Sequence, residues 1–534
     1  MKPTLKLLTL FLLVQLFTQT LSAQITTNSQ WTWMKGDSTS TSQYGVYGQL
    51  GVPAATNKPG GRFESISVKD GSGNVWLFGG YGRASSGTNL YLNDLWKYIP
   101  ATNQWTWMKG DSSAYNHSGI YGTQGIPAAA NNPGGRFGST LWVDASGNLW
   151  LFGGAGFGIS GPNDDLNDLW KYDTSTNQWT WVKGDNTIDK IGIYGVKNVA
   201  SATNKPGSRD EFISWTDNSG NFWLFGGFGW DVSTNGFLND LWKYNPSQNQ
   251  WTWVSGDSLI DKIGVYGTLG IAASTNKPGG RFGSVQWTDG SNFWFFGGTG
   301  YTTNNANNGR LNDLWKYSLS TSQWTWVKGD STLDNLAIYG IKGVPAVINN
   351  PGSREYSVSW YDGSSLWLFG GNGPIYYSGH YLNDLWKYEP SQNQWMWAKG
   401  DSTYNQSGVY GISGVPAISN KPGSRNGSVS WYDGSSFFLW GGTGYNLASI
   451  SLNDLWKLGK DGFVWIGITS TDWTAGSNWS GGVVPGPSDD ATIPGSTPFS
   501  AMVPNGVTVS VRSVTITTGA VVTIGTNAHL NVMH

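Results

Sequence analysis

The sequence predicts an all-β fold in which one four-stranded unit is repeated six times around a ring, a β-propeller followed by a small β-rich domain. Two short motifs recur at a fixed spacing. The hexapeptide Leu-Asn-Asp-Leu-Trp-Lys begins at Leu92, Leu166, Leu238, Leu311, Leu382 and Leu452, with 70 to 74 residues between successive copies. A Trp-x-Trp motif begins at Trp31, Trp105, Trp179, Trp251, Trp324 and Trp395. A fixed period of this length indicates one supersecondary unit copied along an array.

The first complete unit contains four short strands. Phe63–Lys69 is the first, and Asp70–Asn74 follows it as a turn rich in residues that tolerate a positive φ angle. Val75–Phe78 is a continuous apolar run, which is typical of a strand buried on both faces. Asp94–Tyr98 and Trp105–Met108 alternate apolar and polar residues, as expected of the third and fourth strands. Four short strands joined by turns form one blade of a β-propeller.

This unit resembles the kelch repeat, which has an arginine before strand one, two glycines after strand two, an aromatic residue in strand three and a tryptophan at the start of strand four. The arginines are Arg62, Arg136, Arg209, Arg281, Arg354 and Arg425. The paired glycines begin at Gly79, Gly153, Gly226, Gly297, Gly370 and Gly441. The resemblance covers residues 31–458. The units are longer than the usual kelch repeat of about 50 residues, and the excess lies between strand four and the next strand one.

The last blade needs a fourth strand from outside the repeated segment. Trp31–Met34 at the N-terminus can supply it, and this arrangement would pair the two ends of the ring. Phe463–Ile466 is the alternative, because its spacing from the sixth hexapeptide matches that of the first unit. We expect the N-terminal strand, because residues 464–467 also begin a different pattern.

The two ends of the chain differ from the repeats. Residues 1–23 resemble a cleaved secretory signal, with Lys2 and Lys6, the apolar run Leu7–Phe17 and a small-residue ending at Ala23. We therefore expect a secreted or cell-surface protein with its propeller in residues 24–460. Residues 461–534 are rich in Thr, Val, Ser and Gly, and they look like a short β-module of exported bacterial surface proteins. Val507–Val532 alternates like the first rungs of a β-solenoid, without a visible closing element.

Composition excludes several classes of function. The chain has no Cys, so it has no disulfides, thiol nucleophiles or Cys-ligated metals. Its net charge of −2 provides no field that attracts nucleic acid, and no segment after the signal is apolar enough to span a membrane. Copper radical oxidases similar to galactose oxidase need a Cys-linked Tyr and two His ligands, so their chemistry is excluded. Sialic acid mutarotases are six-bladed kelch proteins as well, but no motif here matches their active site. We predict a monomer without cofactor or metal.

Binding residues are expected where the six units differ. The connections between strands two and three and between strand four and the next strand one are long, and both emerge on one face of the ring. Loops held by a rigid scaffold are the usual location of binding sites. The predicted ligand is a glycan or a protein, which aromatic side chains in the variable loops would contact. The alternative is that these aromatic side chains only pack within their own loops. The predicted contacts in the variable loops are Arg83, Trp230, Asp231, Tyr301, Tyr376, Tyr377 and Tyr445.

Acidic residues near the start of strand one suggest an enzyme as the alternative to a binding module. Glu64, Asp210, Glu211 and Glu355 occur where other units have Gly or Asn. Strand one lines the channel of a propeller, so paired carboxyl groups there could perform acid–base chemistry in a mutarotase or lyase. Ordinary pairing with arginine is the competing explanation. Buried acids beside an arginine at the channel mouth would favour the enzyme, and aromatic rings spread over a flat face would favour binding.

Overall fold

The fold is described from a computed structural model of the 534-residue chain. The described residues are 25, 29–38, 41–113, 116–303, 307–374, 380–445, 449–459, 463–479, 484–487, 489–495 and 497–533. The predicted signal at residues 1–23 lies outside them. Within these ranges, no helix is long and apolar enough to cross a membrane.

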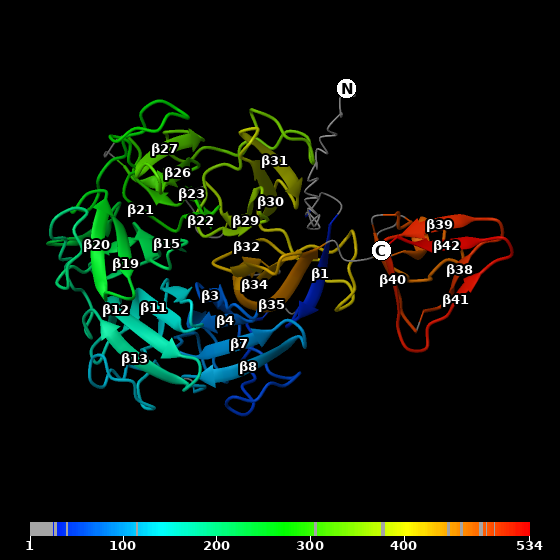
Figure 1. The fold of residues 1–534 in the computed structure, drawn as a ribbon, viewed down its shortest axis with the longest axis horizontal. Helices are drawn as coiled ribbons and strands as arrows, with labels where there is room; N and C mark the ends of the chain where they lie inside the picture. Colours follow the sequence, from blue (N-terminus) through cyan, green and yellow to red (C-terminus); the bar gives the residue numbers. More distant parts are fainter. Residues whose placement is uncertain are drawn as a thin grey trace, which may run out of the picture.

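Six antiparallel four-stranded blades form a ring around a central channel (Figure 1). In order from the channel outward, the first blade contains β3 (Ile66–Lys69), β4 (Val75–Phe78), β7 (Leu95–Ile99) and β8 (Gln104–Lys109). The second blade contains β10 (Thr140–Val143), β11 (Leu149–Phe157), β12 (Asn163–Asp173) and β13 (Gln178–Lys183). The third blade contains β15 (Ile213–Thr216), β16 (Phe222–Phe225), β19 (Leu241–Asn245) and β20 (Gln250–Ser255). This order agrees with the strand order predicted from the repeat.

The other three blades have the same order. The fourth blade contains β22 (Val285–Thr288), β23 (Asn292–Phe296), β26 (Leu314–Ser318) and β27 (Gln323–Lys328). The fifth blade contains β28 (Val358–Tyr361), β29 (Leu366–Asn372), β30 (Tyr381–Glu389) and β31 (Gln394–Lys399). The sixth blade contains β33 (Val429–Tyr432), β34 (Ser436–Tyr445), β35 (Ser449–Gly459) and β1 (Gln30–Lys35). The all-β propeller with six blades is therefore established by strand pairing.

Short strands extend the blades beyond the paired glycines, toward the long loops. They are β2 (Arg62–Phe63), β5 (Tyr81–Gly82), β6 (Leu90–Tyr91), β9 (Arg136–Phe137), β14 (Arg209–Asp210), β17 (Phe228–Trp230), β18 (Asn235–Phe237), β21 (Arg281–Phe282), β24 (Thr299–Gly300), β25 (Gly309–Arg310) and β32 (Arg425–Asn426). We call this side of the ring the long-loop face and the opposite side, which carries the tight turns such as Asp70–Asn74, the short-turn face.

The first strand of each blade differs from the prediction. Phe63–Lys69 was expected to be continuous, but it is divided into β2 and β3 around Glu64, whose φ angle is 52°. A left-handed residue cannot continue an extended strand. The consequence is that Glu64 lies at the channel mouth and not in a sheet.

A buried ion pair joins the start of each blade to the repeated hexapeptide. In the first blade, Arg62 donates two hydrogen bonds to Asp94, and the Tyr47 hydroxyl and the Trp96 indole N–H also donate to this carboxylate. All six pairs have side chains at most 1% exposed and Arg–Asp distances of 2.5 to 2.8 Å. Because each buried charge is paired and hydrogen-bonded, the recurring Arg, Asp, Tyr and Trp residues have a structural role in every blade.

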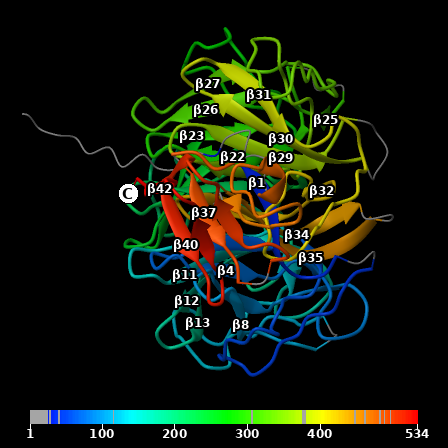
Figure 2. The same cartoon turned by 90° about the vertical axis from the view of Figure 1, so that its right-hand side faces the viewer.

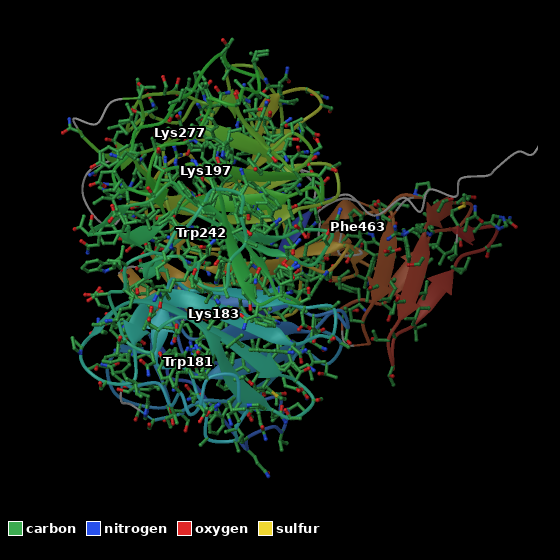
Figure 3. All side chains as sticks on the ribbon, turned by 60° about the vertical axis from the view of Figure 1, so that its left-hand side comes forward. Trp181, Lys183, Lys197, Trp242, Lys277 and Phe463 are labelled. Atoms are coloured by element: carbon green, nitrogen blue, oxygen red, sulfur yellow. The ribbon has the colours of Figure 1, made fainter. Side chains whose placement is uncertain are left out.

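The hydrophobic core lies between neighbouring blades. Trp96 and Trp105 of the first blade pack with Trp431 and Trp440 of the sixth, and the other junctions contain similar clusters. Figure 3 shows side chains filling the ring from blade to blade. Large aromatic side chains therefore provide the stability that disulfides cannot supply in a chain without Cys.

The N-terminal strand closes the ring, as expected. β1 pairs antiparallel with β35, with Trp31 opposite Leu458 and Trp33 opposite Trp456. The alternative strand, residues 463–466, is instead used by the C-terminal module, where β36 (Phe463–Val464) pairs parallel with β37 (Asp490–Ile493). Ring closure thus joins Trp31 to Leu458, which are 427 positions apart in the sequence.

The C-terminal module follows the ring beside β1 (Figures 1 and 2). After η1 (Gly476–Asn478), its strands form two rungs: β37, β38 (Ala501–Val503) and β39 (Thr508–Val511), then β40 (Ser513–Ile516), β41 (Val522–Ile524) and β42 (His529–Val532). Each strand of the second rung pairs parallel with its counterpart in the first. These parallel ladders agree with the predicted start of a solenoid, and Trp465, Trp473 and Trp479 fill its first end.

Candidate functional site

A ring of six residues, one from each blade, surrounds the channel at the long-loop face. They stand two positions after the repeated arginine and are Glu64, Gly138, Glu211, Gly283, Tyr356 and Gly427. All six have φ angles between 52° and 64°. The backbone N–H of each donates to the carbonyl of its counterpart in the preceding blade, at 2.8 to 3.2 Å, and the sixth bond closes the circle. We call this ring the collar.

The collar alternates large residues with glycine around the ring. A Cβ on Gly138 would lie 3.1 Å from Glu211 Cγ, and a Cβ on Gly427 would lie 3.3 Å from Glu64 Cγ. A Cβ on Gly283 would lie 3.2 Å from the Tyr356 ring. The glycines therefore leave space for the three large side chains. These three residues hold a left-handed backbone conformation that costs roughly 1 kcal/mol or more in a residue other than Gly, a strain that is concentrated at functional sites.

The three large side chains of the collar form one hydrogen-bonded group. The Tyr356 hydroxyl donates to Glu211 Oε2. Glu64 Oε2 is buried and has no partner if both glutamates are ionised, but a protonated Glu64 can donate to Glu211. A cavity of about 150 Å³ lies here, lined by these side chains and by serines that directly precede the first strands of their blades.

Burial and mutual repulsion change the acidity of the two glutamates. Burial raises the pKa of Glu64 well above its ordinary value, and the charge of Glu211 raises it further. Burial also raises the pKa of Glu211, to about 7, although hydrogen bonds from Tyr356 and Glu64 oppose this shift. The pair therefore retains one proton at neutral pH, and its second proton titrates near pH 7. Such a pair can both donate and accept hydrogen bonds.

Aromatic rings stand on two sides of the channel mouth, and all of them are partly exposed. One cluster, from the first two blades, contains Phe63, Tyr81, Tyr91, Phe137 and Phe157, with ring centroids 5.3 to 6.4 Å apart. The second cluster, from blades three to five, contains Phe228, Phe237, Phe282, Tyr301 and Tyr356, at 5.4 to 6.5 Å. The mouth is thus a polar floor between two aromatic walls.

An ion pair completes the rim of the mouth. Arg310 contacts Glu355 at 2.8 Å, and Glu355 also accepts from the Thr299 hydroxyl at 2.6 Å. Glu355 is therefore paired with an arginine, as the competing explanation for the strand-one acids expected. Glu64 and Glu211 instead share a hydrogen bond with each other and with Tyr356.

The predicted contact residues lie in different environments. Tyr301 belongs to the second aromatic wall and packs edge-on against Phe237 at 5.4 Å. The Trp230 indole donates to Asp189 at 3.1 Å. Asp231 is only 1% exposed, and it accepts from the backbone N–H groups of Ser233, Thr234 and Ile260. Its carboxylate is thus engaged in the loops that it holds together.

Two further predicted contacts, Arg83 and Tyr445, lie outside the two aromatic clusters. Arg83 lies over the Tyr44 ring at 5.4 Å and donates to Gly87 O. Tyr445 ends β34, where its N–H donates to Ser424 O at 2.8 Å. Tyr376 and Tyr377 lie outside the described residues, so their role stays a prediction.

Sequence reasoning missed several residues of the mouth. Phe63, Phe137 and Phe282 follow the repeated arginine directly, and Tyr356 follows it by two positions. A comparison of the six copies at these two positions would have indicated them, because these positions vary while the arginine before them does not. In the described part of the chain, no three His, Cys, Asp or Glu side chains lie close enough to hold a metal ion.

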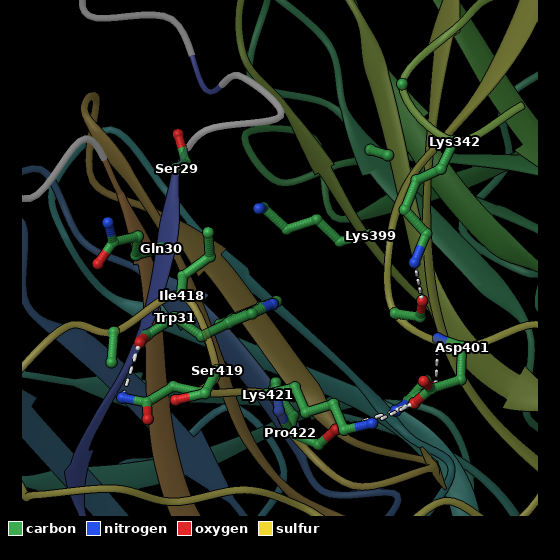
Figure 4. A pocket seen from close by; sticks show the side chains of 16 residues that line it. Ser29, Gln30, Trp31, Lys342, Lys399, Asp401, Ile418, Ser419, Lys421 and Pro422 are labelled. Carbon is green, nitrogen blue, oxygen red and sulfur yellow. Dashed lines mark hydrogen bonds and ion pairs between the residues drawn. The ribbon is translucent and has the colours of Figure 1, made fainter. Parts of the chain in front are cut away.

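A larger cavity, of about 580 Å³, lies where β1 closes the ring (Figure 4). Lys342, Lys399 and Lys421 line it, and Lys421 pairs with Asp401 at 2.7 Å. Burial, together with the charge of Lys342, lowers the pKa of Lys399 to about 8. Blade five has the small Ala398 where the other five blades have Met or Val, and Ile25 belongs to the same hydrophobic cluster as Ala398. The space is therefore explained by local packing at the closure.

Comparisons with known proteins provide no family assignment. No family model matches the chain, and no curated protein matches it. A solved structure titled "Structure of YjhT" is 14% identical, with a TM-score of 0.43, over 77% of this chain and 95% of that one. The strand pairings, and not this distant likeness, establish the six-bladed β-propeller.

Proposed function

We propose that this chain is an exported, kelch-type propeller that binds a glycan at the mouth of its channel on the long-loop face. One observation supports this most: the hydrogen-bonding floor formed by Glu64, Glu211 and Tyr356 lies between two walls of partly exposed aromatic rings. Ligand sites are concave, mostly apolar, and contain a few well-placed polar groups.

The chemistry of the mouth suits sugars better than a flat protein surface. Aromatic rings stack on the apolar faces of sugar rings, and the carboxyl pair can accept from and donate to hydroxyl groups. The cavity of about 150 Å³ accommodates part of one sugar unit, and the walls extend the contact to its neighbours. A glycan chain could therefore enter the floor with one unit and lie along the walls with others.

Export and the kelch class rest on the sequence. The N-terminal segment has the charge, apolar run and small-residue ending of a secretory signal. The arginine, paired glycines and tryptophans recur in all six units. A secreted or cell-surface location would expose the long-loop face to extracellular glycans.

The test is a glycan-array screen with the purified chain, followed by calorimetry on each ligand found. Phe282→Ala should weaken binding about tenfold or more, because it removes one face of the second wall. Phe499→Ala is the matched control, since Phe499 is a 43% exposed ring of the C-terminal module, and its affinity should equal that of the wild type. Failure of every glycan to bind, or equal affinity in both variants, would refute the proposal.

A carbohydrate-active enzyme of the mutarotase or lyase type is the second candidate. The specific observation in its favour is the buried Glu64–Glu211 pair, because the pKa of about 7 at Glu211 suits a general acid or base. NMR can detect both anomeric exchange and formation of an unsaturated product. Turnover that follows a pKa near 7 and is lost in Glu211→Gln supports the enzyme. Binding of a glycan without turnover would contradict the enzyme and support the binding module.

A further inference from the structure

Two sequence positions meet at the junctions between blades, just above the collar. One is the residue before the repeated hexapeptide, and the other directly follows the repeated arginine of the next blade. Tyr91 meets Phe137 at 5.5 Å, and Phe237 meets Phe282 in a stacked pair, also at 5.5 Å. Arg310 meets Glu355 in the ion pair of 2.8 Å. In these three junctions the two side chains are complementary.

The junction between blades two and three has two acids at the same positions, Asp165 and Asp210. The side chains are only 3% and 8% exposed. One buried oxygen of each, Asp165 Oδ2 and Asp210 Oδ1, has no hydrogen-bond partner among the residues described. Buried polar groups without partners are rare and costly in native proteins. The junction therefore lacks the complementary group that these three junctions contain. Among the residues described, Asn426 at the junction of blades five and six also has a buried oxygen without a partner, but that residue carries no charge.

The surroundings do not supply the missing positive charge. Asp164, Asp189 and Glu211 add further negative charge near Asp165. Arg209 is the nearby cation, but its guanidinium is already bound to Asp240 at 2.6 and 2.8 Å. Burial and these acids raise the pKa of Asp165 to about 8. Asp210, which faces Glu211, Asp165, Glu64 and Asp164, also has a raised pKa, first because of its burial.

We propose that the Asp165–Asp210 junction receives the free ammonium group of an amino sugar in the bound glycan. An ammonium group has three N–H donors and no acceptor, which matches the two orphaned carboxylate oxygens. The junction between blades four and five supports this match, because the cationic group of Arg310 occupies the same register position against Glu355. A metal ion is a poorer match, since no three acidic or His side chains converge within the described residues.

The position of the junction also suits a sugar. Tyr91 of the first aromatic wall lies within electrostatic range of Asp164 and Asp210, and its hydroxyl accepts from Asn163 at 2.9 Å. Asp165 pairs in the β-ladder with Ala155, which in turn pairs with Phe137 of that wall. A sugar ring stacked on the wall could therefore place an amine at the carboxyl pair. This inference rests on the proposed glycan binding and specifies its ligand.

The experiment compares glucosamine oligomers with N-acetylglucosamine oligomers of equal length, by calorimetry on the full chain. Acetylation removes the ammonium charge and leaves the sugar ring, so the wild type should bind the free amine 10- to 100-fold more tightly. Asp165→Asn and Asp210→Asn should each reduce this preference to less than threefold. Asp164→Asn, which removes an exposed neighbouring charge, is the control and should keep most of the preference.

Binding of the amine should also release a proton. At pH 6 the sugar amine is protonated, and the pKa of about 8 keeps the unliganded Asp165 protonated as well, so the bound ammonium group must displace that proton. The binding enthalpy measured at pH 6 should therefore differ between phosphate and MES buffers in the wild type, and this difference should vanish in Asp165→Asn. This measurement on the wild type remains decisive even if a variant does not fold.

The outcomes separate this inference from the proposed function. Equal binding of both oligomers by the wild type overturns the amine site and leaves glycan binding intact. Binding of neither oligomer, with no other glycan bound, overturns both. A lysine tripeptide that competes as well as the glucosamine oligomer would identify a peptide amine as the source and overturn the amino sugar.

Discussion

Three large residues of the collar, Glu64, Glu211 and Tyr356, are held in a backbone conformation that the three glycines between them adopt without strain. Folding alone does not require large residues at these three positions, because glycine at all six positions would form the same circle of hydrogen bonds. The strained residues are also those that place two carboxyl groups and a phenol in the channel. At this scale, function is indicated by the departure from six-fold repetition.

The Glu64–Glu211 pair predicts a dependence of stability on pH. The pKa of Glu211 is raised in the folded state to about 7 from 4.5, so the folded protein binds this proton more tightly than the unfolded chain does. The stabilisation is complete below about pH 4.5 and is lost as the pH rises through 7. Wild type should lose on the order of 2 kcal/mol more than Glu211→Gln between pH 5 and pH 8. Urea denaturation measures this difference, and equal losses would contradict the account of the pair.

The buried ion pairs predict a large effect of single substitutions. Arg136→Met leaves the Asp168 carboxylate buried without its partner, which should cost about 3 to 5 kcal/mol of unfolding free energy. Lys58→Met removes a partly exposed pair with Asp37 and should cost at most about 1 kcal/mol. Thermal and urea denaturation compare the two. A similar small loss in both variants would mean that the Arg–Asp pairs do not hold the blades together.

At the scale of elements, β1 is the strand that converts a row of blades into a closed ring. Trp31 is 3% exposed, and it packs with Trp456 of its own blade and with Phe369 of the fifth blade. Trp31→Ala should therefore destabilise the propeller by about 3 to 5 kcal/mol. The exposed Phe499→Ala should leave its melting temperature unchanged. An unaltered melting temperature in Trp31→Ala would mean that ring closure by β1 contributes little.

The blades were predictable because their signals are local and repeated. The hexapeptide, the paired glycines and the Trp-x-Trp motif mark strands by short-range pattern, and six copies reinforce each other. The division of the first strand at Glu64 was not predicted, because the strand was assigned from the first unit, which has Glu at this position, although Gly138, Gly283 and Gly427 occupy it in three other units. Similarly, Asp165 and Asp210 are 45 positions apart, and only the register between neighbouring blades brings them to one junction. The candidate site depends on such contacts, so the sequence indicated its face and a few of its residues.

At the scale of the whole molecule, the ring has two unlike faces. The short-turn face carries turns of one design, in which an Asp such as Asp70 or Asp217 accepts hydrogen bonds from its own turn and from a nearby indole N–H. The long-loop face carries the collar, the two aromatic walls and the unmatched acids. The repeat therefore supplies a rigid scaffold, and variation is concentrated at one end of its channel.

The central claim is that a glycan binds at this end of the channel, and hydrogen–deuterium exchange on the full chain tests it most directly. With a saturating glycan, the account predicts slower exchange in the peptides that span residues 81–91, 228–237 and 299–303, which border the mouth. Peptides that span the turns 70–74 and 217–221 should exchange at unchanged rates. Protection confined to those turns or to the C-terminal module would place the ligand elsewhere and contradict the account.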